Sequence, residues 1–175
     1  FRHEINTIQR QYDETFIKDF LKIYIGYIKK YLVINTETKI EAFILEKSKI
    51  KKDSTKNIVK DGIHIMIPNI ISFPKLQYIL RHKMINNKNV KSLFSKLNIT
   101  NSLDDVFDIC VIEKNNWQMY GSTKPGCEPY RVTKIYDLTN DDIIEVPKNK
   151  YNNRELLSIL SIRNKNKTDI QEFKE

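Results

Sequence analysis

Residues 60–70 read Lys60-Asp61-Gly62-Ile63-His64-Ile65-Met66-Ile67-Pro68-Asn69-Ile70, and residues 63–67 alternate between two kinds of side chain. In an extended chain the three isoleucines fall on one side, and His64 and Met66 fall on the other. Pro68 has no amide proton to offer a neighbouring strand, so it marks the end of the run. The stretch predicts a short β-strand that carries a histidine opposite its apolar face.

The rest of the chain predicts helices and strands without a regular alternation. Apolar residues recur at helical spacing in four segments, and β-forming residues cluster in four others. The predicted helices cover 12–34, 74–85, 90–97 and 154–162, and the predicted strands, besides the one above, cover 39–46, 106–112, 117–120 and 131–138. The lysine-rich segment 47–60 is expected to be a solvated loop.

This pattern favours an α+β fold with a mixed or antiparallel sheet packed by helices. The chain has only 4 glycines and no glycine fingerprint of a dinucleotide-binding or P-loop fold. Its 175 residues suit one domain, predicted over 1–162, with a polar tail or linker over 163–175. No apolar run reaches the roughly 18–20 residues of a membrane span, so no membrane partner is expected.

The charge is compatible with a polyanionic partner. The 24 lysines and 6 arginines exceed 22 acidic residues by 8, and lysine attracts phosphates as a point charge without geometric selection. The 2 cysteines make no disulfide framework, and no Cys/His spacing is typical of zinc. A reducing, intracellular compartment is the simpler interpretation.

Three places carry possible chemistry. His64 follows the side-chain-free Gly62, yet a lone strand histidine is more often structural. Asp108 interrupts an apolar run, where a carboxylate is costly unless it meets a cation or solvent. The turn Gly121-Ser122-Thr123-Lys124-Pro125-Gly126 suits phosphate oxygens, although a plain hairpin explains it nearly as well. Trp117, Tyr120 and Tyr130 flank it and either stack bases or fill a core.

The order of these features resembles the archaeo-eukaryotic primase superfamily, and more narrowly the primase domain of the primase-helicases of nucleocytoplasmic large DNA viruses. Gly62-Ile63-His64 matches its small-x-His motif and Phe107-Asp108 its hydrophobic-Asp motif. The resemblance implies an RRM-like catalytic sheet, a nucleotide-phosphate contact for His64, a metal role for Asp108, and further phosphate contacts for Lys124 and Ser122. His64 and Asp108 are expected to face one cleft, with Lys124 beside His64.

The resemblance also implies what surrounds this chain. The family's acidic Asp-x-Asp strand precedes its long helix, so we expect the missing pair just upstream of Phe1. The parent would make primers on single-stranded DNA from nucleoside triphosphates with two Mg²⁺ or Mn²⁺ ions, in one polypeptide with a superfamily 3 helicase domain, in the host cytoplasm if viral. The 175 residues alone are expected to be inactive. The alternatives are a non-catalytic single-strand-binding module and a replication scaffold that uses segment 47–60.

Overall fold

The computed structural model describes residues 1–115, 117, 119–161 and 170–174. It divides into two compact units, and each is described by itself. The first unit consists of Phe1–Ile28, Ser48–Gly62 and Pro74–Asn115. The second consists of Lys29–Lys47, Ile63–Phe73 and Asn116–Glu175.

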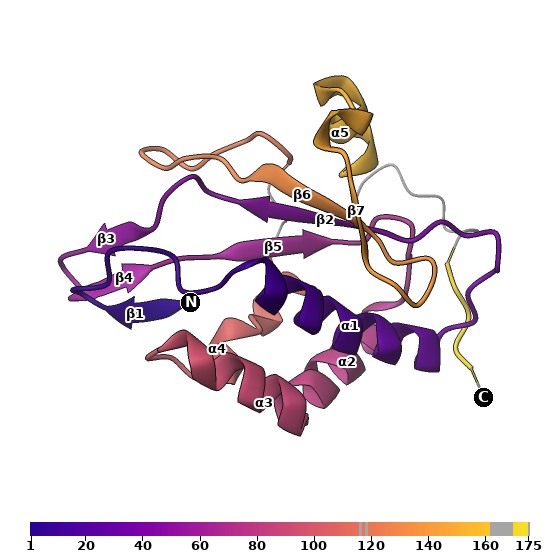
Figure 1. The fold of residues 1–175 in the computed structure, drawn as a ribbon, viewed down its shortest axis with the longest axis horizontal. Helices are drawn as coiled ribbons and strands as arrows, with labels where there is room; N and C mark the ends of the chain where they lie inside the picture. Colours follow the sequence, from indigo (N-terminus) through magenta and orange to yellow (C-terminus); the bar gives the residue numbers. More distant parts are fainter. Residues whose placement is uncertain (116, 118, 162–169, 175) are drawn as a thin grey trace. The chain divides into compact units, whose positions relative to one another are not determined.

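The first unit contains a three-stranded antiparallel sheet in the order β1-β4-β3 (Figure 1). Its strands are β1 (Arg2–Glu4), β3 (Lys51–Asp53) and β4 (Ile58–Lys60). The expectation of a solvated loop over 47–60 was therefore wrong. The reason lies in the turn: Asn57 adopts a positive φ of 52° and Asp53 accepts a hydrogen bond from the amide of Lys56, so the chain folds back into a hairpin.

Helices pack against one another beside this sheet. The predictions over 12–34 and 74–85 are confirmed by α1 (Glu14–Tyr31), whose last residues belong to the second unit, and α2 (Pro74–Asn86). The prediction over 90–97 corresponds to α3 (Lys88–Phe94) and the 3₁₀ helix η1 (Ser95–Leu97). Asn87 caps α3 by accepting hydrogen bonds from two backbone amides.

Aromatic rings fill the core of the first unit. Phe94 lies at the centre of this cluster, with ring centroids 5.1 Å from Phe16, 6.1 Å from Phe20 and 5.6 Å from Phe107. Edge-to-face and tilted pairs of this kind add stability beyond the area they bury. The cluster holds α1, α3 and the segment that precedes Asp108 together.

The strand predicted over 106–112 was wrong. This segment forms α4 (Leu103–Val106) and then the 3₁₀ helix η2 (Ile109–Val111). Ser102 caps α4, and Asp108 caps η2 by accepting a hydrogen bond from the amide of Cys110 at 2.9 Å. Two side chains that accept from nearby amides thus override the β-propensity of the apolar residues.

The second unit is built on a four-stranded antiparallel sheet in the order β5-β2-β6-β7 (Figure 1). Three of its strands confirm sequence predictions, and β2 is buried along its whole length. The bounds are β2 (Glu41–Glu46), β5 (Ile63–Met66), β6 (Arg131–Asp137) and β7 (Ile144–Val146). The antiparallel sheets and helices confirm the α+β fold class. No strand includes Trp117, Met119 or Tyr120, and residues 116 and 118 lie outside the described part.

One helix completes the core of the second unit. α5 (Asn153–Ile159) begins at a capping box between Asn152 and Glu155 and follows the short 3₁₀ helix η3 (Lys148–Lys150). One buried cluster of this core consists of Phe43, Leu45, Ile135, Val146, Leu156 and Leu160. The helix predicted over 154–162 is thus present, although residues 162–169 lie outside the described part. Of the predicted tail, residues 170–174 hydrogen-bond to backbone at Tyr31, Val33 and Ile71. Among the described helices, none is both long and apolar enough to cross a membrane.

Candidate nucleotide site

His64 lies in the middle of β5, directly across from Leu45 of β2. Together with Met66 it faces a small pocket in the second unit, as the alternation of β5 predicts. Leu45 belongs to the buried core, so the histidine side of β5 is packed and the imidazole is only half exposed. The two-residue period therefore brings a titratable ring to a pocket wall.

An aromatic stack surrounds His64. Its ring lies face to face with Tyr130, with centroids 3.9 Å apart and planes inclined by 17°. Trp117 approaches at 5.4 Å with its plane turned by 69°, and the ammonium of Lys47 lies 5.0 Å from the centre of the Tyr130 ring. These distances are typical of stacking, edge-to-face and cation–π contacts. The stack thus connects three places in the sheet: Lys47 directly follows β2, His64 lies in β5, and Tyr130 directly precedes β6.

The surroundings lower the pKa of His64 from its ordinary value of 6.5. Burial is the larger cause, because it penalises the charged imidazolium, and the positive charge of Lys47 is the second. The neutral imidazole is thus favoured near neutral pH. A bound polyanion would act in the opposite direction, because it stabilises the protonated ring.

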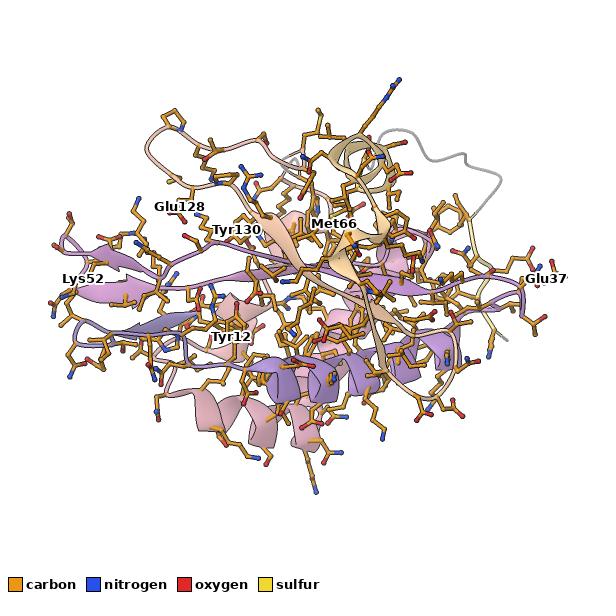
Figure 2. The ribbon with its side chains drawn as sticks, turned by 45° about the horizontal axis from the view of Figure 1, so that its top comes forward. Tyr12, Glu37, Lys52, Met66, Glu128 and Tyr130 are labelled. Carbon is orange, nitrogen blue, oxygen red and sulfur yellow. The ribbon has the colours of Figure 1, made fainter. Side chains whose placement is uncertain are left out.

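The pocket beside His64 is apolar and aromatic, with few polar groups. Figure 2 shows the side chains and labels Met66 and Tyr130 among them. Ligand sites in proteins commonly combine an apolar lining with a few placed polar groups, and here those groups include the His64 imidazole and the Ser122 hydroxyl. The lining residues are Leu45, His64, Met66, Trp117, Met119, Tyr120, Ser122 and Tyr130.

The loop over 121–126 forms turns, as predicted. Gly121 and Gly126 adopt positive φ values of 78° and 69°, which glycine tolerates without strain. The Ser122 hydroxyl donates to the carbonyl of Met119 at 2.7 Å, which holds it at the pocket. Lys124 is exposed on the same loop and does not line the pocket. The structure thus brings His64 and Ser122 to one pocket, and the pairing of Lys124 with His64 stays a prediction.

Asp108 lies in the first unit, exposed at the start of η2. The preceding residue anchors it: Phe107 packs against Phe20 and Phe94, and its carbonyl accepts a hydrogen bond from Arg81 at 2.6 Å. Asp108 was expected in a strand, where the free-energy cost of burying a carboxylate would require a cation or solvent beside it. An exposed capping carboxylate carries no such cost, and the shared cleft with His64 stays a prediction.

A metal centre needs more ligands than Asp108. In the described part of the chain, no three His, Cys, Asp or Glu side chains are grouped so that they could hold a metal ion. One carboxylate does not fit a two-metal site, which requires several oxygens around each ion. The described residues therefore do not form such a centre by themselves.

The surroundings of His64 were not predicted from the sequence, and Tyr130 and Lys47 illustrate this. Tyr130 was expected to stack on a base or to fill a core, whereas it stacks on the imidazole itself. Lys47 was expected in a solvated loop, whereas its ammonium lies over the Tyr130 ring. Neither contact leaves a signal in local spacing, because the three residues are far apart in the sequence.

Comparison with known proteins identifies the family. Residues 1–136 match the family described as "C962R protein N-terminal AEP domain", where AEP denotes the archaeo-eukaryotic primases. The chain belongs to this family. The match includes the His64 strand, Asp108 and the loop 121–126, and it confirms the resemblance to viral primase domains that the motifs indicated.

Two relatives come from large DNA viruses. "Putative helicase L207/L206" of Acanthamoeba polyphaga mimivirus is 34% identical over 130 residues, 73% of this chain and 13% of the relative. "Putative helicase 184R" of Invertebrate iridescent virus 6 is 27% identical over 122 residues, 62% of this chain and 12% of the relative. The chain thus spans about an eighth of these relatives, whose names describe helicases.

Proposed function

We propose that this chain is the main part of the primase domain of a viral primase-helicase, which makes primers on single-stranded DNA from nucleoside triphosphates. The match over residues 1–136 is the observation that carries the proposal. The names of the two relatives support a helicase domain in the same polypeptide, and the family resemblance implies that this helicase is of superfamily 3. The primase role, as in the family, is transfer of a nucleotidyl group to a 3′ hydroxyl.

His64 is proposed to contact the triphosphate, with Ser122 at the same pocket and Lys124 on the adjacent loop. An imidazole N–H, a hydroxyl and an ammonium are all donors to phosphate oxygens, and charged donors make the stronger bonds. Ser122 would have to turn its hydroxyl from Met119 toward the ligand.

Asp108 is proposed to be this chain's ligand to the divalent ions, Mg²⁺ or Mn²⁺. The other carboxylates would come from an Asp-x-Asp strand upstream of Phe1, as the family pattern implies. The metals would supply activation of the attacking hydroxyl and stabilisation of the leaving pyrophosphate. This chain would place one carboxylate at the end of a segment fixed by Phe107 and Arg81.

A row of cations in the first unit is proposed to contact the DNA backbone. Arg2, Lys60 and Lys51 are directly paired across β1, β4 and β3, so their side chains lie on one face. His3 and Val59 occupy the opposite, buried face. On the cationic face Asp53 binds Lys60 at 2.6 Å and Glu4 lies in the next row. The guanidinium of Arg2 lies 3.9 Å from the carboxylate of Asp105. Lysine contacts without base readout suit a template that must be copied whatever its sequence.

The test is primer synthesis by a protein that includes the upstream segment. We expect metal-dependent incorporation, its loss in Asp108→Asn with DNA binding retained, and weakened nucleotide use in His64→Ala. Exposed Asp142→Asn and His82→Ala serve as matched controls. The 175 residues alone should be inactive. Binding of DNA without any metal or triphosphate dependence would instead favour the non-catalytic module, and full activity of Asp108→Asn would remove the metal assignment.

A further inference from the structure

We infer that Tyr130 is a positioning residue that fixes the imidazole of His64 for its contact with a phosphate group. The inference rests on the proposed nucleotide role of His64 and adds a positioning role for Tyr130. Its basis is the stacked geometry, with ring centroids 3.9 Å apart and planes inclined by 17°.

Among the described residues, ring contacts rather than hydrogen bonds orient the His64 imidazole. Neither of its ring nitrogens hydrogen-bonds to a residue that the structure describes. The other two histidines differ: Nδ1 of His3 lies 3.3 Å from the carbonyl oxygen of Asn98, and Nδ1 of His82 lies 3.5 Å from the Asn86 amide nitrogen. A structural histidine usually has such a partner, which sets its ring orientation. For His64 we infer that the flanking rings set the orientation of the imidazole.

Stacking leaves the functional part of the imidazole available. Tyr130 covers a face of the ring, whereas the two ring nitrogens, one of which carries the N–H of the neutral imidazole, lie in the plane of the ring and point past the stack. Trp117 meets the imidazole with its plane turned by 69°, which further limits rotation of the ring. A half-buried imidazole that is held between flanking rings, and whose nitrogens bond to no described residue, is prepared to donate to an incoming oxygen.

Lys47 adds a positive charge to the stacked rings of His64 and Tyr130. Its ammonium lies 5.0 Å from the centre of the Tyr130 ring, and its charge also reaches His64. Besides His64, the pocket is lined by Ser122, three aromatic residues and three aliphatic ones, none of them a carboxylate. The local charge therefore favours an anion, and the nucleoside triphosphate is the anion that the proposed function supplies.

The test compares Tyr130→Phe, which keeps the ring, with Tyr130→Leu, which removes it. In the full-length protein we expect the phenylalanine variant to retain nucleotide affinity, and the leucine variant to raise the KM for nucleoside triphosphate roughly two- to tenfold with little change in kcat. Tyr120→Leu is the matched control, because Tyr120 lines the same pocket and makes no ring contact with His64 among the described residues.

A double-mutant cycle with His64→Ala decides the mechanism. If Tyr130 acts through His64, Tyr130→Leu should raise the KM no further once His64 is alanine, whereas Tyr120→Leu should have the same effect in both backgrounds. Multiplicative effects of Tyr130→Leu and His64→Ala would overturn the inference and leave the proposed function standing. An unchanged KM in His64→Ala would instead contradict the nucleotide site itself. If Tyr130→Leu does not fold, Tyr130→Met takes its place in the cycle.

Discussion

The guanidinium of Arg81 on α2 donates to the backbone carbonyl of Phe107, 2.6 Å away, directly before Asp108. It also donates to the carbonyl and the carboxylate of Asp104, each at 2.9 Å. One side chain therefore holds both ends of α4 and fixes the segment that presents Asp108. The proposed metal ligand thus depends on a residue 27 positions earlier in the chain.

Arg81→Leu should loosen this segment. The substitution removes three hydrogen bonds from a charged donor, and we expect a loss of about 2 kcal/mol in the free energy of unfolding. Hydrogen exchange should accelerate at the amides of Val106 and Phe107, which close α4. Arg154→Leu, at an exposed position of α5, is the control. Unchanged exchange in Arg81→Leu would show that the aromatic cluster alone holds the segment.

Lys47→Gln should raise the pKa of His64. The positive charge of Lys47 disfavours protonation of the imidazole, so its removal moves the pKa back toward 6.5, although burial still keeps it below that value. An NMR titration of the ring protons measures the change. Exposed Lys49→Gln should have a smaller effect. A downward movement of the pKa would contradict the charge geometry.

Glu41→Ala should weaken the second unit most clearly near neutral pH. Burial by itself raises the pKa of this carboxyl, but hydrogen bonds from Lys150, Tyr151 and Lys39 together outweigh it and lower the pKa from 4.5. The carboxylate therefore contributes stability above about pH 4.5, and this contribution is lost as the pH falls.

We expect Glu41→Ala to cost about 2 kcal/mol at pH 7 and progressively less in acid, measured by denaturant unfolding. Glu145→Ala is the control, because its exposed pair with Lys134 should contribute under about 1 kcal/mol. A loss that does not depend on pH would show that packing, rather than charge, explains the role of Glu41.

Lys51→Gln should reduce DNA binding more than Lys52→Gln. The two lysines are adjacent on β3, but Lys51 pairs with Lys60 on the cationic face and Lys52 pairs with Val59 of the buried face. Lys52 is labelled in Figure 2. Each phosphate contact contributes about 0.7 to the salt dependence of single-strand binding, so only Lys51→Gln should lower that slope by about this amount. Equal slopes for the two variants would indicate diffuse attraction.

Much of the fold follows from local sequence. Helix α1 and strands β2, β5 and β6 were predicted because each carries a periodic apolar pattern that matches one type of secondary structure. The hairpin over 51–60 and the helices around Asp108 were not predicted. In these segments, capping and turn residues determine a structure that the neighbouring residues do not favour. Short polar side chains that bind backbone amides outweigh propensity in segments this short.

The sequence by itself determined the motifs, the α+β class and the family, because these depend on residue order and local periodicity. Only the tertiary structure decided the partners of His64. Lys47, Tyr130 and Trp117 are distant from it along the chain, and the pairing of β5 with β2 together with the path of the chain into β6 brings them to one place. Ring stacking and burial arise from that pairing, so the orientation and lowered pKa of His64 are properties of the folded unit rather than of its motif.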